Sequence, residues 1–170
     1  MLSIAILSHL LVKNFMEQDV ELIYPQLGFQ TTFDSLSKYN QIKLRRGVGQ
    51  FIILYNRHFT AIHISKGVLT YFNSIGSDNT TSNPIVCDLL KRYNLTLNDK
   101  SFRIQAKSSS LCGLYCIAFL KKRDINEYNK QALTEFFHMF NFDKLEKNDA
   151  IVKKYLKITP TIFKFMSKNK

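Results

Sequence analysis

The chain has 170 residues, and its 24 Lys and Arg against 13 Asp and Glu give a formal net charge of +11. Because 45% of the residues are hydrophobic and 22% are charged, the composition excludes a disordered or fibrous protein, and the length suits a single domain spanning residues 1–170. The charge favours a polyanionic partner such as DNA about as much as a merely basic surface, and it says nothing about catalysis.

The first predicted element is an amphipathic helix near the N-terminus. Its apolar residues recur at helical spacing, at Ile4, Leu7, Leu11 and Phe15. This apolar run is too short to span a bilayer, and it lacks the basic stretch and the cleavage site of a secretory signal, so we expect neither secretion nor a membrane partner. Residues 17–47 are mixed in character, and Pro25 and Gly28 predict loop there.

Strands are predicted in the middle of the chain. Residues 51–55 form a short apolar run that is typical of a buried strand. Residues 58–64 and 68–73 flank a Ser-Lys-Gly turn, which is the clearest hairpin signal in the sequence. If that turn is tight, Ser65 pairs with Val68, and the register of the whole hairpin follows.

Helices and one further strand are predicted after the hairpin. Residues 76–84 indicate a loop, residues 85–93 a helix, residues 101–105 a strand and residues 112–123 a strongly apolar helix. The pattern is helical from residue 126 onward, with apolar faces at Leu133, Phe136, Phe137, Phe140, and at Ile151, Tyr155 and Leu156. Strands in the middle and helices at both ends predict an α+β domain, with a central mixed or antiparallel β-sheet flanked by helices.

The cysteines suggest a nucleophile rather than a framework of disulfides. Three are present, Cys87, Cys112 and Cys116; they cannot all pair, and they lack a CxxC zinc spacing, which favours a reducing compartment. Cys112 begins the apolar helix, after serines whose hydroxyls can cap it, and there the helix N-terminus should lower the thiol pKa. The N–H groups of the first turn can also bind a developing oxyanion, and Gly113 leaves the approach open. Cys87 and Cys116 are interpreted as buried thiols.

A thiolate nucleophile needs a base and a group that orients the base, and His58 and Asn73 can supply both. In the predicted hairpin register Asn73 lies diagonal to His58 on one face, whereas His63 points to the opposite face. The amide oxygen of Asn73 would accept a hydrogen bond from one imidazole nitrogen and leave the other directed at Cys112. A slip of one residue in the hairpin would select His63 instead.

Gln105 completes the set of candidate residues. Its side-chain amide is a donor that could form an oxyanion hole with the backbone N–H of Cys112, provided that the short loop between them folds back. Considered alone, Gln105 would be an ordinary surface residue, so its assignment depends on the other three.

In this order, the four residues resemble the catalytic set of the adenovirus-type (adenain-like) cysteine protease family, which is related to the SUMO-deconjugating proteases. The matching motifs are His58-Phe59, the aromatic-rich residues 71–76 (Tyr-Phe-Asn-Ser-Ile-Gly), and Gln105 followed by Cys112-Gly113. The likeness spans roughly residues 48–123, with a looser helical likeness over residues 145–149. Phe59 replaces the usual Trp and Asn73 replaces the usual acid. Because Asn73 cannot stabilise an imidazolium with charge, lower activity is expected.

The resemblance implies a papain-like-superfamily fold and a cysteine endopeptidase. It makes Cys112 the nucleophile, His58 the base and acid, Asn73 the group that orients His58, and Gln105 the oxyanion donor. The implied reaction is acyl transfer through a thioester, followed by hydrolysis, with no metal and no cofactor needed for the chemistry. The implied substrates are viral capsid and core precursor proteins, cut beside small residues during virion maturation. DNA and a short activating peptide are implied cofactors. We expect a monomer, in the virion and the host nucleus or another reducing intracellular compartment.

Two alternatives stay open. One is an isopeptidase for SUMO or another ubiquitin-like protein, against which the compact length argues mildly. The other is a catalytically idle protein of the same fold, kept as a basic DNA-binding or capsid-associated protein, which the substitutions at Phe59 and Asn73 keep plausible. The basic residues are more often a solvated face than a site, although non-specific DNA binding through them is a fair hypothesis.

Overall fold

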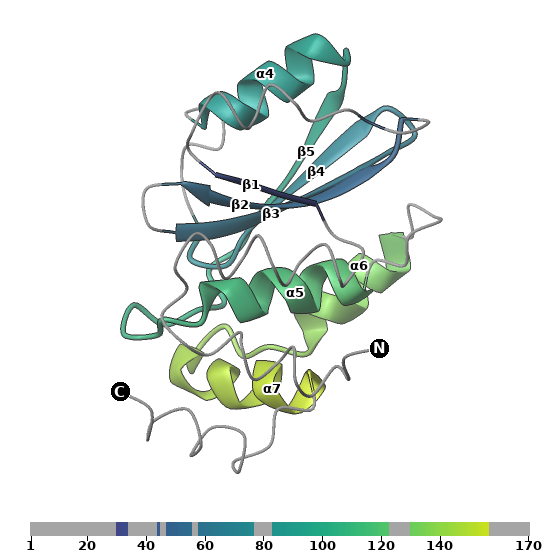
Figure 1. The fold of residues 1–170 in the computed structure, drawn as a ribbon. Coiled ribbons are helices and arrows are strands. Elements are labelled where there is room, and N and C mark those ends of the chain that lie inside the picture. Colours follow the sequence, from purple (N-terminus) through teal and green to yellow (C-terminus); the bar gives the residue numbers. More distant parts are fainter. Residues whose placement is uncertain are drawn as a thin grey trace, which may run out of the picture.

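A five-stranded mixed sheet lies at the centre of the described residues, between helix α4 (Pro84–Arg92) on one face and helix α5 (Cys112–Lys122) on the other (Figure 1). This computed structural model describes residues 30–33, 44, 47–55, 58–76, 83–122 and 130–156. The strands, in sheet order, are β1 (Gln30–Phe33), β2 (Gly49–Tyr55), β3 (His58–Ser65), β4 (Val68–Asn73) and β5 (Thr96–Ser101). The two outer pairs, β1–β2 and β4–β5, are parallel and the two inner pairs are antiparallel. The prediction of an α+β fold with a mixed sheet flanked by helices is confirmed.

The predicted helices of the second half are present. Helix α4 begins with Pro84 in its first turn, and the side chain of Asn83 caps it by accepting a hydrogen bond from the N–H of Ile85 at 3.0 Å. After α5 come helix α6 (Lys130–His138), the short 3-10 helix η3 (Leu145–Lys147) and helix α7 (Asn148–Tyr155). These last helices lie on the α5 side of the sheet (Figure 1).

The hairpin of β3 and β4 has the predicted register. Lys66 and Gly67 both have positive φ angles, 50° and 75°, as the tightest hairpin turns require. Ser65 pairs with Val68, and the alternation that follows continues to the pair Ala61 and Phe72. The turn therefore decides which side chains of both strands face α4 and which face α5.

Two predicted segments differ from the structure. The region over residues 17–47, interpreted as mixed with loop at Pro25 and Gly28, contains the edge strand β1, whose four residues are too few to show an alternating pattern. The strand predicted over residues 101–105 is wrong, because β5 precedes it and ends at Ser101. The sequence of β5, Thr-Leu-Asn-Asp-Lys-Ser, is largely polar because the strand forms an edge of the sheet, so periodicity does not reveal it. The predicted N-terminal helix lies outside the described residues, as does most of the predicted loop over residues 76–84.

The sheet separates two cores. On the α4 side, alternate residues of the strands pack against the helix, among them Phe51, Ile62 and Leu69. On the α5 side, Phe72 stacks on Phe119 with ring centroids 4.5 Å apart. Helix α5 is apolar all round, so every residue from its second to its ninth is buried. The face predicted after residue 126 is buried here too, at Leu133, Phe136, Phe137 and Phe140.

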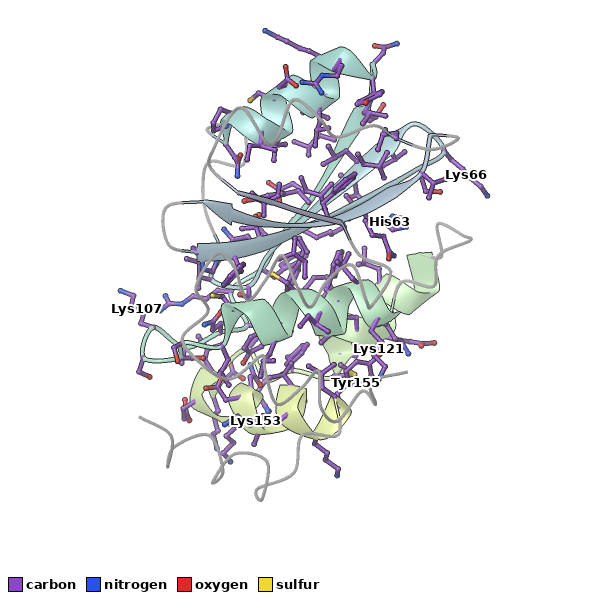
Figure 2. The ribbon with its side chains drawn as sticks, in the orientation of Figure 1. His63, Lys66, Lys107, Lys121, Lys153 and Tyr155 are labelled. Atoms are coloured by element: carbon purple, nitrogen blue, oxygen red, sulfur yellow. The ribbon has the colours of Figure 1, made fainter. Side chains whose placement is uncertain are left out.

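Four of the described lysines lie on different parts of the surface (Figure 2). Lys66 projects from the hairpin tip, Lys107 projects from the opposite side of the view, and Lys121 and Lys153 lie on the helical side (Figure 2). Within the described ranges, no helix is long and apolar enough to cross a bilayer.

Candidate active site

Three of the four predicted site residues stand at the ends of regular elements, and Gln105 lies in the loop before α5. His58 begins β3 and Asn73 ends β4, and because these strands are antiparallel, both lie at the end of the hairpin opposite its turn. Cys112 begins α5, and its sulfur accepts a hydrogen bond from the backbone N–H of Phe59, the residue after His58. The fold therefore brings the start of α5 to the open end of the hairpin.

His58 and Asn73 form the contact that the register predicts. The Nε2 atom of His58 lies 2.8 Å from the Oδ1 atom of Asn73, and the Asn73 side chain is buried at 4% exposure. The backbone N–H of Ile75 donates to the same Oδ1 at 3.2 Å, which fixes the orientation of the amide, because an N–H needs an oxygen as its acceptor. Nε2 must then carry the proton in the neutral ring, and Nδ1 keeps the lone pair. This is the tautomer that a base requires.

The ionisation of the thiol and imidazole differs from the expectation. Burial raises the pKa of the Cys112 thiol, and backbone N–H groups of Phe59, Gly113 and Cys112 itself offset only part of that effect. Burial also lowers the pKa of His58, against the raising effect of its hydrogen bond to Asn73. The prediction of a lowered thiol pKa is therefore wrong, because desolvation outweighs the helix N-terminus. Near neutral pH the site holds a thiol and a neutral imidazole.

The first turn of α5 offers N–H groups to the sulfur. Leu111 occupies the N-cap position, where its carbonyl accepts from the N–H groups of Leu114 at 2.9 Å and Tyr115 at 3.2 Å. An apolar side chain cannot cap the helix, so the N–H groups of Cys112 and Gly113 are available and both reach the sulfur. The expected capping by the preceding serines takes another form, since the Ser109 hydroxyl accepts from the N–H of Leu111 at 3.2 Å instead.

Gln105 is buried at 2% exposure, in the segment that leads to Cys112. Its Oε1 accepts from the Ser74 hydroxyl at 2.6 Å, and its Nε2 donates to the carbonyl of Ser109 at 2.9 Å. Because a backbone carbonyl can only accept, the second contact fixes the orientation of the amide. In the structure the Nε2 donor of Gln105 is directed at the carbonyl and the hydroxyl of Ser109. The role of Gln105 as an oxyanion donor stays a prediction.

His63 and Cys116 are buried as the sequence predicts, whereas Cys87, interpreted as a buried thiol, is partly exposed. His63 is buried on the α5 side of β3, near the hairpin turn and away from the end where Phe59 meets Cys112 (Figure 2). Cys116 is fully buried in α5, and Cys87 is half-buried in α4. Among the described residues, no group of His, Cys, Asp or Glu side chains could hold a metal ion.

Sequence reasoning missed a second group of polar residues behind Cys112. Ser74 contacts Gln105, and Asp149 on α7 accepts hydrogen bonds from Ser109 and Tyr115. No spacing signal links Asp149 to a loop so distant in the chain.

Comparison of the chain with models of known protein families and with curated proteins finds no match.

Proposed function

We propose that this protein is a cysteine endopeptidase with a papain-like fold, similar to the adenain-like proteases. It would cleave viral precursor proteins during virion maturation, in the virion and the host nucleus or another reducing compartment. The observation that carries this proposal is the 2.8 Å contact between His58 Nε2 and Asn73 Oδ1, beside a cysteine at the uncapped start of a buried helix. Each of these features has a role in acyl transfer.

The chemistry starts from a neutral pair. As the Cys112 sulfur bonds to the carbonyl carbon of the scissile peptide, its proton passes to Nδ1 of His58. The N–H groups at the start of α5 stabilise the oxyanion. The imidazolium then gives its proton to the leaving amine, and a thioester remains. His58 next takes a proton from water, whose oxygen attacks the thioester and releases the acid and the thiol.

Asn73 would orient His58 throughout this sequence. It holds Nε2–H, so Nδ1 is the only nitrogen that can accept the thiol proton. As an amide it adds no negative charge beside the imidazolium, so the ion pair is less stable than it would be next to a carboxylate. The proposed enzyme therefore relies on orientation more than on charge.

The test uses peptides that carry internal sites of a small residue followed by Gly. We expect the native protein to cleave them, Cys112→Ala to be inactive, and Cys116→Ala to retain cleavage, because Cys116 lies one turn away in the same helix and is fully buried. Cleavage that survives Cys112→Ala would overturn the proposal. Labelling by ubiquitin-like vinyl-sulfone probes without peptide cleavage would support an isopeptidase instead.

A catalytically idle, basic protein of the same fold is the second candidate. It is favoured by the raised pKa of the Cys112 thiol and by the absence of charge on Asn73, both of which disfavour a ready thiolate. The formal net charge of +11 fits a non-specific contact with DNA. DNA and an activating peptide are proposed as cofactors on resemblance alone. Running the cleavage assay with and without DNA separates the candidates: no cleavage, together with salt-sensitive DNA binding, would favour the idle protein.

A further inference from the structure

The polar group behind Cys112 is centred on one carboxylate oxygen. Oδ1 of Asp149 accepts from the Ser109 hydroxyl at 2.8 Å and from the Tyr115 hydroxyl at 3.0 Å. Ser109 lies in the segment before Cys112, and Tyr115 lies one turn after Cys112 in α5. A single side chain of α7 therefore ties together the two stretches of chain that flank the nucleophile.

Asp149 also decides how the Ser109 hydroxyl is turned. A hydroxyl has one hydrogen, and that hydrogen points at the carboxylate, so its lone pairs must face the other way. There they accept from the backbone N–H of Leu111 at 3.2 Å and from Nε2 of Gln105 at 3.3 Å. Leu111 directly precedes Cys112. The contact with Asp149 is thus transmitted to the N-cap of the helix that carries the nucleophile.

Tyr115 is held in the donor state. Burial raises its pKa, and the neighbouring charge of Asp149 raises it further, so the hydroxyl keeps its proton and donates to the carboxylate. The ring of Tyr115 is fully buried, with Phe140 as a neighbour at 5.6 Å between centroids. This buried tyrosine therefore ties Asp149 to α5.

The opposite end of the segment is fixed by the residue beside Asp149. The amide of Asn148 is fully buried and donates to the carbonyls of Ile104 and Asn141, both at 2.7 Å, while it accepts from the N–H of Asn141 at 2.8 Å. The N–H groups of Ile104 and Gln105 both donate to the carbonyl of Ser74 at 2.9 Å. The segment of residues 104–111 is therefore held near its first residues by Asn148 and Ser74, and near its last residues by Asp149.

We propose that Asp149 is a positioning residue for the proposed protease reaction. Through Ser109 it orients the N–H of Leu111, at the N-cap of α5, and the side-chain amide of Gln105. It thereby fixes the position of Cys112 relative to His58, which Asn73 holds. This inference rests on the proposed function for its catalytic consequence. The order it imposes on residues 105–111 does not depend on that function.

The test compares Asp149→Ala with Asp149→Asn. The Asn variant keeps a carbonyl oxygen that can accept from both hydroxyls, so it should rescue what the Ala variant loses. Glu146→Ala is the matched control, because it removes an exposed carboxylate from the neighbouring 3-10 helix. Three measurements are made on each protein: kcat and KM for a cleaved peptide, the alkylation rate of Cys112 by iodoacetamide, and amide hydrogen exchange over residues 105–111.

We expect Asp149→Ala to lower kcat by about 10²-fold with little change in KM, since a misplacement of about 1 Å can have that effect. Exchange at the Leu111 amide should accelerate in the same variant, and Asp149→Asn and Glu146→Ala should behave like the native protein. Ser109→Ala should also accelerate exchange at the Leu111 amide, and the double variant should be less impaired than the sum of the two single variants, because both remove the contact between Ser109 and Asp149. If Asp149→Ala does not fold, Ser109→Ala provides the same comparison.

The proposal is overturned if Asp149→Ala leaves both kcat and exchange at Leu111 unchanged, or if Asp149→Asn is as impaired as Asp149→Ala. If the native protein cleaves no peptide, the proposed function fails, and exchange and alkylation still decide whether Asp149 orders the segment. Faster exchange with an unchanged alkylation rate would mean that Asp149 holds the loop without positioning the sulfur, and would also overturn the proposal.

Discussion

Replacing Asn73, the uncharged residue that orients His58, by an aspartate should change the pKa of His58. In Asn73→Asp, a carboxylate takes the place of the amide oxygen that lies 2.8 Å from Nε2. The N–H of Ile75, which donates to that oxygen at 3.2 Å, can still donate to the carboxylate, so the side chain should keep its position. The substitution therefore tests charge at nearly constant geometry.

The expected size follows from the distance and the burial. An opposite charge within hydrogen-bond distance stabilises an imidazolium by about 1.5–4 kcal/mol, or about 10- to 10³-fold in its protonation equilibrium. Burial lowers the pKa of His58 in the native protein, so the added charge acts against that effect. The pKa of His58 should rise in Asn73→Asp, and the thiolate–imidazolium pair should be more populated at neutral pH.

The assay is a pH titration of the His58 ring protons by NMR, together with the alkylation rate of Cys112 at neutral pH. Both the pKa of His58 and the alkylation rate should increase in Asn73→Asp. Asn98→Asp is the control, since it adds the same charge to β5, where the Asn98 amide contacts Thr70. An unchanged His58 titration in Asn73→Asp would refute the account of how His58 and Asn73 are coupled.

Three further predictions concern stability and pH. Because the pKa of His58 is lowered in the folded state, the unfolded chain binds more protons than the folded protein at pH values between the lowered pKa and 6.5, and the free energy of unfolding should rise with pH over that window. His58→Gln should flatten this rise. Denaturant titrations between pH 5 and 7 measure it, and an equal slope in both proteins would contradict the prediction. Because Lys66 and Gly67 both have positive φ, Lys66→Asn should stabilise the protein by a few tenths of a kcal/mol, and Gly67→Ala should destabilise it by about 1 kcal/mol. The Tm should therefore shift in opposite directions in the two variants, and shifts in the same direction would argue against this turn. Asn148→Ala should lower the free energy of unfolding by about 3 kcal/mol, because it leaves two carbonyls and one N–H buried without their partner. Asn148→Asp should be as unstable, because its carboxylate oxygens would face those two carbonyls. Recovery of stability in Asn148→Asp, measured by denaturant titration, would contradict the contacts of that amide.

The hairpin and its consequence could be predicted from sequence because they depend on local rules. A Lys-Gly turn with positive φ at both positions fixes the register, and the register alone places Asn73 beside His58 and turns His63 away. The start of α5 at Cys112 can also be predicted from the sequence, because the apolar run that forms the helix begins there.

The parts that sequence could not provide depend on distant contacts and on burial. The edge strands β1 and β5 are too short or too polar to show a period. The link from Asp149 to Ser109 joins residues that only the packing of α7 brings together. The pKa of Cys112 was predicted with the wrong sign, because the helix N-terminus is visible in the sequence and the degree of desolvation around the sulfur is not.

The most direct measurement of the central claim is the mass of the protein during turnover of a peptide. The reaction is stopped with acid after the first turnover, and the intact protein is weighed and then digested. If Cys112 is the nucleophile and His58 its base, the native protein should carry one acyl fragment of the peptide on Cys112, and Cys112→Ala should carry none. Peptide cleavage with no such adduct in the native protein and with undiminished rate in Cys112→Ala would contradict the account.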